Sequence, residues 1–257
     1  MKRLACVSLI VFVLFGVIGC AGGQQGSATS TETDTINSDN EDKTTIKTNS
    51  SAEDVKAEVT KKAFQVWKDS VNAVWGHGAI EIKNTGNVSI EIGDISISFV
   101  GKDKSILATM SMVLPVPEIL QPGEVAYAGD STTIEGLTEP SEVAGIEANI
   151  DFDKTDSKAQ LLEITSLKII SSDYGGPKVT GRVSNTSSEN ADDIRIAIAL
   201  FDDKNNLLGV YTDSPDVTLA PGKSMGFETN YPFIEVKGFA SKVKKMVGIA
   251  FNWKFGL

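Results

Sequence analysis

The sequence predicts an all-β protein that contains two tandem β-sandwiches. Short runs such as ISISF (95–99), IRIAIALF (194–201) and GIAFNWKF (248–255) alternate with period two, as strands with one buried face do. Pro-Gly pairs at 122–123 and 221–222 are among the turn signals between the runs. Many short strands separated by turns are typical of antiparallel sandwiches.

An internal repeat sets the number of sandwiches. IKNT (82–85) matches VSNT (183–186), and further blocks recur in the same order with their apolar positions in phase. The other matched blocks are 95–99 with 196–200, 106–107 with 207–208, 120–123 with 219–222, and 145–146 with 248–249. We therefore expect one sandwich over 62–153, a hinge over 154–160 and a second sandwich over 161–257.

The N-terminus has the pattern of a secretory signal that ends in a cysteine. Lys2-Arg3 precedes an apolar stretch over 4–18, and Gly19 leads to Cys20. A stretch of this length is too short to cross a bilayer, which argues against Cys20 being buried in an ordinary apolar helix. Residues 1–20 resemble the signal peptide (1–19) and lipobox of bacterial lipoprotein precursors. The resemblance implies S-diacylglycerol on Cys20, cleavage before it and N-acylation of its amine, and two or more acyl chains anchor a protein stably.

Residues 20–61 are expected to form the lipidated cysteine and a disordered tether. From Ala21 to about Asp54 the chain is polar and has hardly an apolar residue, so it cannot bury enough surface to offset its ordering entropy. Near its end, Val55, Val59 and Ala63 are spaced by four, with acids first and lysines last, which predicts a short helix over 52–62. The alternative is that this segment is simply the end of the tether.

Charge and cysteine content exclude several functions. Removal of residues 1–19 takes away Lys2 and Arg3, which leaves 22 basic and 34 acidic residues and a formal charge of 22 − 34 = −12. An acidic surface repels nucleic acid and anionic headgroups, so we expect no nucleic-acid partner and a membrane contact through the lipid alone. Cys6 lies in the signal and Cys20 carries the lipid, so no thiol remains for a disulfide, a nucleophile or a metal site.

The second repeat resembles FxLYD-type domains of bacterial surface lipoproteins. It contains VTGRVSNT (179–186), IALFD (198–202) and LAPG (219–222), in the order of that family's strand and turn motifs. Ile198 and Phe201 stand where the motif has Phe and Tyr. In the first repeat, residues 97–101 match the motif only in the alternation of their apolar positions. The resemblance implies a fold of two tandem immunoglobulin-like sandwiches, and it implies no reaction and no cofactor.

Few residues suggest chemistry. His77 is the only histidine, and a general base or metal site needs further groups, so we interpret it as a loop or strand-edge residue. Asp151, Asp153 and Asp156 contain oxygen ligands suited to calcium, but they lack the EF-hand glycine and distal glutamate. We favour Asp151 and Asp153 as outward residues of a strand. Asp202–Asn206 reads as a hairpin turn. No catalytic and no metal-binding residue is therefore predicted.

Two groups of residues suggest binding. Trp67, Trp75 and Trp253 suit a platform for stacking sugars, although core positions are the favoured alternative. The segment 110–124 is rich in Met, Pro and aliphatic residues, and its prolines place it at a sheet edge or in a loop. An exposed apolar edge binds a partner strand or a ligand, whereas the alternative buries Met112, Leu114 and Ile119. The candidate binding edge consists of Met112, Leu114, Pro115, Val116 and Pro117.

These observations predict a non-enzymatic protein held by lipid on the extracytoplasmic face of a bacterial cell membrane. Its expected partner is a protein or a cell-wall component. A carrier of small molecules or carbohydrates is the alternative function. Ala21 follows Cys20 in place of the Asp that, by resemblance to Gram-negative lipoproteins, retains such proteins at the inner membrane.

Overall fold

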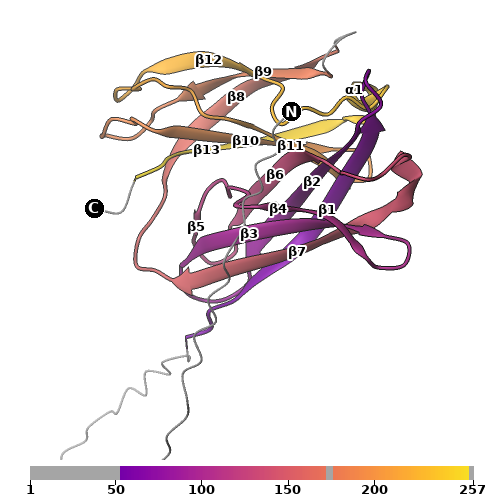
Figure 1. The fold of residues 1–257 in the computed structure, drawn as a ribbon. Coiled ribbons are helices and arrows are strands. Elements are labelled where there is room, and N and C mark those ends of the chain that lie inside the picture. The colour runs from indigo at the N-terminus through magenta and orange to yellow at the C-terminus, as the bar shows by residue number, and fades with distance from the viewer. Residues whose placement is uncertain (1–52, 172–175, 255–257) are drawn as a thin grey trace, which may run out of the picture. The chain divides into compact units, whose positions relative to one another are not determined.

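The computed structural model describes residues 53–171 and 176–254 (Figure 1). The predicted signal peptide, Cys20 and the tether up to residue 52 lie outside the described residues. The described residues all fall within one compact unit, 50–257. They form antiparallel β-sheets with almost no helix, which confirms the predicted all-β class. Among them, no helix has both the length and the apolar composition needed to cross a membrane.

The first half consists of two sheets. β1 (Ala57–Lys68), β2 (Val74–Asn84) and β6 (Val125–Thr133) pair in the order β1-β2-β6. In the second sheet, β3 (Ile90–Gly101) pairs with β4 (Ile106–Ser111), β5 (Ile119–Leu120) and β7 (Val143–Lys154). A short 3-10 turn, η1 (Pro140–Glu142), precedes β7.

The second half pairs its strands in the same order. Its strands are β8 (Gln160–Ile170), β9 (Lys178–Ser184), β10 (Ile194–Phe201), β11 (Leu207–Asp213), β12 (Ser224–Thr229) and β13 (Lys245–Asn252). The order β8-β9-β12 repeats β1-β2-β6, and β11-β10-β13 repeats β4-β3-β7. Additional pairing of Ala250 with Leu162 joins β13 to β8, so the second half is one six-stranded sheet by pairing order. The one-turn helix α1 (Phe239–Lys242) lies before β13.

A buried asparagine occurs at the same place in each half. The Asn84 side-chain amide donates to the carbonyl oxygens of Val88 at 2.8 Å and Leu120 at 3.0 Å. The Asn185 amide donates to the carbonyl oxygens of Glu189 and Leu219, both at 2.7 Å. Both side chains are fully buried, and each also satisfies backbone groups that its own turn would leave unpaired.

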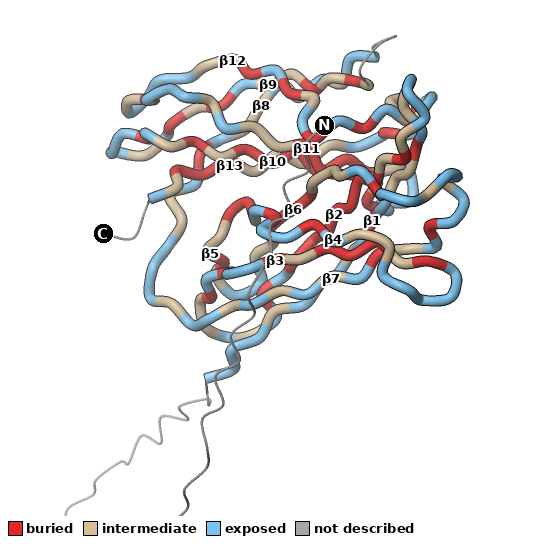
Figure 2. The backbone as a smooth tube through the Cα atoms, in the orientation of Figure 1, coloured by how far each residue is buried: buried red, intermediate tan, exposed pale blue. Residues whose placement is uncertain are grey.

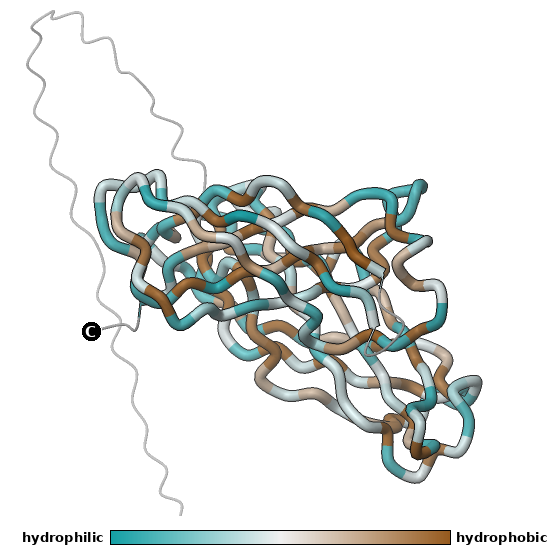
Figure 3. The backbone as a smooth tube through the Cα atoms, turned by 90° about the horizontal axis from the view of Figure 1, so that it is seen from above, coloured by the Kyte–Doolittle hydropathy of each residue, from teal (hydrophilic) through white to brown (hydrophobic). Residues whose placement is uncertain are grey.

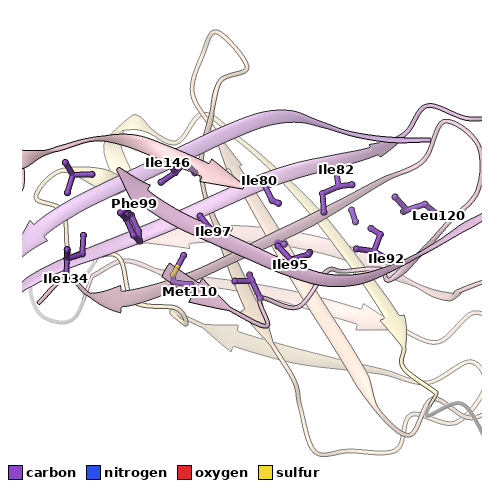
Figure 4. Close-up of a cluster of buried hydrophobic side chains, with 14 of the residues drawn as sticks. Ile80, Ile82, Ile92, Ile95, Ile97, Phe99, Met110, Leu120, Ile134 and Ile146 are labelled. Atoms are coloured by element: carbon purple, nitrogen blue, oxygen red, sulfur yellow. The ribbon is translucent and has the colours of Figure 1, made fainter. Parts of the chain in front are cut away.

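Each half has its own hydrophobic core. In the first half, Ile80 of β2 and Ile97 and Phe99 of β3 belong to one buried cluster with Met110 of β4 and Ile146 of β7 (Figure 4). The second core contains the alternate residues Ile194, Ile196, Ile198 and Leu200 of β10, together with Tyr211 and Phe227. Hydrophobic (brown) and hydrophilic (teal) stretches follow one another closely along the described chain in Figure 3.

A third cluster, which we call the middle cluster, joins the two halves. It contains residues of β1, β2 and β6 from the first half and of β10, β11 and β13 from the second half. In agreement with this, β11 contacts β1, β2 and β6. Its members are Ala63, Ala79, Val116, Tyr127, Ala197, Ala199, Phe201, Leu207, Val210 and Phe251. Strands β2 and β10 are therefore buried on both faces (Figure 2).

The helix predicted over 52–62 is wrong, because Ala57–Lys68 forms β1. A spacing of four is also a multiple of two, so the apolar spacing fits a strand as well as a helix. In the structure a bulge between Val59 and Lys61 turns Val59 toward the first core and Ala63 toward the middle cluster. Pairing with β2 along its whole length decides in favour of the strand. The fold thus begins before the predicted end of the tether at residue 61. Between the halves, residues 155–159 connect β7 to β8.

Loss of either buried asparagine amide should destabilise the fold. Asn185→Ala and Asn84→Ala each remove the two hydrogen bonds that a buried side-chain amide donates and the backbone hydrogen bond that its oxygen accepts, so the free energy of unfolding should fall by about 2–3 kcal/mol. The exposed Asn190→Ala is the matched control and should change it by less than about 0.5 kcal/mol. Urea denaturation of the three variants measures this, and a loss no greater than the control's would contradict the assigned role.

Candidate functional site

A cleft lies where the two halves meet, at one end of the middle cluster. We call it the junction cleft; its volume is about 430 Å³. One wall comes from the loop between β4 and β5 and from Gly129 and Asp130 of β6. The other comes from β10, from the end of β11 and from Phe251 and Trp253 in and after β13. Gly129 allows β6 and β11 to approach each other closely, since a Cβ at this position would lie 3.0 Å from the Val210 side chain.

The predicted binding edge forms much of the first wall. Met112, Leu114, Pro115 and Val116 line the cleft, whereas Pro117 is buried and does not. The side chains of Met112 and Leu114 are 78% and 59% exposed, so they are not the buried caps of the alternative interpretation. Val116 anchors the loop to β6, because its N–H donates to the Tyr127 carbonyl at 2.9 Å and its carbonyl accepts from the Tyr127 N–H at 3.0 Å.

Trp253 is fixed in the opposite wall by groups from both halves. Its indole Nε1–H donates to Glu118 Oε2 at 2.6 Å. The Arg195 guanidinium lies 4.7 Å from the centre of the Trp253 ring and forms an ion pair with Asp193. One face of the tryptophan ring is therefore already covered.

The charged groups of the junction cleft are mainly acidic. Burial raises the pKa of Glu118, although the hydrogen bond from Trp253 opposes the rise. Burial also raises the pKa of Asp213, whose carboxylate accepts from the Ser214 N–H. Asp130 accepts from the Tyr231 hydroxyl at 3.3 Å. Three carboxylates thus line the cleft together with the single guanidinium of Arg195, which is already paired with Asp193, so the cleft favours a ligand with positive charge.

His77 is not the loop or strand-edge residue expected from the sequence. It lies within β2, is fully buried and contacts both halves. Its Nε2 accepts from the Val210 N–H at 3.2 Å, and its Nδ1 lies 3.1 Å from Ser131 Oγ. Since Ser131 Oγ–H donates to the Phe233 carbonyl, Nδ1 carries the proton in this arrangement. Burial lowers the pKa of His77 to about 3, and a backbone hydrogen bond with Asp130 opposes this only in part. The residue is a neutral structural link.

The tryptophans occupy two places and do not form one platform. Trp67 and Trp75 are cross-strand partners with ring centres 6.3 Å apart and an angle of 14° between their planes. With Asp69, Phe233 and Glu235 they line a second space of about 110 Å³, which we call the aromatic hollow. Trp67 is buried, and its indole nitrogen has no hydrogen-bond partner within the described residues. Trp253 lies in the junction cleft instead.

The acidic segments 151–156 and 202–206 lie on a strand and its end and in a turn, respectively. Asp151 and Asp153 are exposed on β7, with Ile150 and Phe152 turned inward, as expected. Asp202 closes the turn between β10 and β11 by accepting from the backbone N–H groups of Lys204 and Asn206. Across residues 53–171 and 176–254, no three His, Cys, Asp or Glu side chains are grouped to hold a metal ion.

Comparisons with known proteins give little further information. No protein-family model and no curated protein matches the sequence. A solved structure of a calcium binding mutant of Bacteroides uniformis beta-glucuronidase 2 matches at 11% identity with a TM-score of 0.19. The match covers 68% of this chain and 28% of that one, so this chain spans less than a third of the glucuronidase. A similarity this low supports no conclusion about fold or activity.

Burial of His77 should make the fold sensitive to mild acid. The unfolded chain binds a proton at His77 near pH 6.5, whereas the folded protein does so only near pH 3, so stability falls as the pH falls through 6.5. Between pH 7 and pH 5 this histidine should reduce the free energy of unfolding by about 2 kcal/mol. Urea denaturation at several pH values measures the slope. His77→Gln is the comparison, and an equal slope in the two proteins would contradict the prediction.

Proposed function

We propose that this chain is a non-catalytic binding protein anchored by lipid at Cys20 to the extracytoplasmic face of a bacterial membrane. The basic start, the short apolar stretch and the small residue before Cys20 support the anchor. The polar tract after Cys20 suits a tether between the lipid and the folded unit.

Within this proposal, the folded unit is a tandem pair of immunoglobulin-like sandwiches. The same pairing order in both halves supports this interpretation. The equivalent asparagines Asn84 and Asn185, each at the end of the second strand of its half, support it further. Sandwiches of this kind often serve as binding modules, and their architecture alone specifies no reaction.

The junction cleft is the observation that carries the proposed binding function. It combines an exposed apolar wall, at Met112 and Leu114, with the carboxylates of Glu118, Asp130 and Asp213. A ligand with an apolar group and a positive charge could pack the apolar group against this wall and place the charge near the carboxylates, and both contacts would be favourable. We infer that the ligand is a segment of a protein or cell-wall partner that carries such a cationic group.

The second candidate function is a carrier of a small molecule. A volume of about 430 Å³ lies within the range of small-ligand sites, which favours it. A sugar ligand is less well supported, because Arg195 covers a face of Trp253 and Trp67 is buried.

Replacement of the cysteine tests the anchor. In cells fed a labelled fatty acid, the unaltered protein should incorporate label and fractionate with membranes. Cys20→Ala should remove the thiol that accepts the diacylglyceryl group, and therefore both properties. The protein amount is measured by immunoblot in each fraction, and labelled Cys20→Ala protein would refute lipid attachment at this residue.

Introduction of a charge into the apolar wall tests the cleft. With a photoreactive residue at Pro115, irradiated cells should yield a defined crosslinked adduct, and Leu114→Glu should reduce its yield about tenfold by disrupting the apolar contact. Ile106→Glu is the matched control, since Ile106 is 66% exposed on β4 and lies outside the cleft. Mass spectrometry identifies the adduct, and a small-molecule adduct would support the carrier function. Equal yields from the Leu114 and Ile106 variants would exclude binding at the cleft.

A further inference from the structure

The aromatic hollow is a second space between the two halves. Trp67 of β1, Asp69 of the following turn and Trp75 of β2 form its side in the first half. Phe233 and Glu235, from the segment between β12 and α1, form its side in the second half. Three aromatic rings therefore border a space of about 110 Å³, roughly the volume of three to four water molecules.

Both charged residues of the hollow are acidic. Asp69 Oδ2 accepts from Trp75 Nε1 at 3.0 Å, and Asp69 Oδ1 accepts from the N–H groups of Val71 and Ala73. Although partial burial alone would raise it, these hydrogen bonds hold the pKa of Asp69 below its usual value, so the carboxylate is ionised at neutral pH. Within the described chain no basic side chain lines the hollow, and the nearby Lys68 is paired with Glu139 at 2.8 Å.

This combination of rings and carboxylates suits one class of ligand. A cation is attracted to aromatic rings through their quadrupole, and recognition of quaternary ammonium groups by several rings is a general use of that attraction. A compact, weakly hydrated ammonium also fits a space of this size better than a hydrated metal ion or a sugar ring does. We propose that the aromatic hollow is a binding site for a quaternary ammonium group.

The site is separate from the junction cleft. The two spaces share none of their lining residues: Tyr231 lines the cleft, and Phe233, two positions later, lines the hollow. Two hydrogen bonds to backbone carbonyls hold the segment that carries both residues. The Thr212 N–H donates to the Tyr231 carbonyl at 2.7 Å, and the Ser131 side-chain Oγ–H donates to the Phe233 carbonyl at 3.0 Å. Replacement of the Phe233 side chain leaves these hydrogen bonds in place.

Choline and 3,3-dimethyl-1-butanol form the decisive pair of probes, because they have the same shape and differ in the charge. Titration of the full chain, followed by tryptophan fluorescence and by NMR shifts, should show saturable choline binding that is about tenfold tighter than binding of the neutral alcohol. Equal affinity for the two probes would show an unselective apolar space and overturn the proposal. Absence of saturable choline binding would overturn it as well.

Variants locate the binding. Phe233→Ala and Glu235→Gln should each weaken choline binding several-fold, since each removes one attractive group from the hollow. The matched controls are Phe64→Ala, with a side chain 37% exposed compared with 45% for Phe233, and Glu147→Gln on β7. Circular dichroism checks that each variant folds. Asp213→Asn alters only the junction cleft, so choline binding that depends on Asp213 and is indifferent to Phe233 would refute the proposed location.

Discussion

The packing of sheet β1-β2-β6 against strands β10, β11 and β13 is the constraint on which the rest of the structure depends. Alanines at 63, 79, 197 and 199 and Gly129 let these layers approach closely, and Tyr127 and Phe201 fill the wider part of the middle cluster. Hydrogen bonds cross the same contact, from Gln65 Nε2 to the Leu208 carbonyl and from the Val210 N–H to His77. These strands therefore have one face on the core of their own half and the other on the middle cluster, and neither half can change position without disturbing the middle cluster.

Both candidate sites follow from that contact. Two twisted sheets diverge away from the place where they touch, and loops from each half border the spaces that remain. The β4–β5 loop and the end of β13 border the junction cleft, and the segment Tyr231–Glu235 lies between the cleft and the aromatic hollow. Each of the two spaces is lined by acidic and aromatic residues, and the acidic lining agrees with the strongly negative formal charge of the chain.

The local structure could be predicted from the sequence, whereas the long-range packing could not. Alternation in IRIAIALF and the repeated Asn-containing turns predict β10 and the corresponding turns because both signals are local. The burial of both faces of β10 is harder to predict, because Ala197 and Ala199 suit an exposed face as well as a tightly packed one. The helix expected over 52–62 failed for a similar reason: only the pairing of β1 with β2 distinguishes the two interpretations. The partners in the cleft are farther apart still, since Glu118 and Trp253 are separated by 135 residues and no motif connects them.

The middle cluster has a consequence for any attempt to divide this chain. Each half has an apolar flank that the other half covers, so a fragment that contains one half alone would expose the apolar side chains of that flank to water. Such fragments should aggregate, and expression of either half would therefore require polar substitutions along this flank.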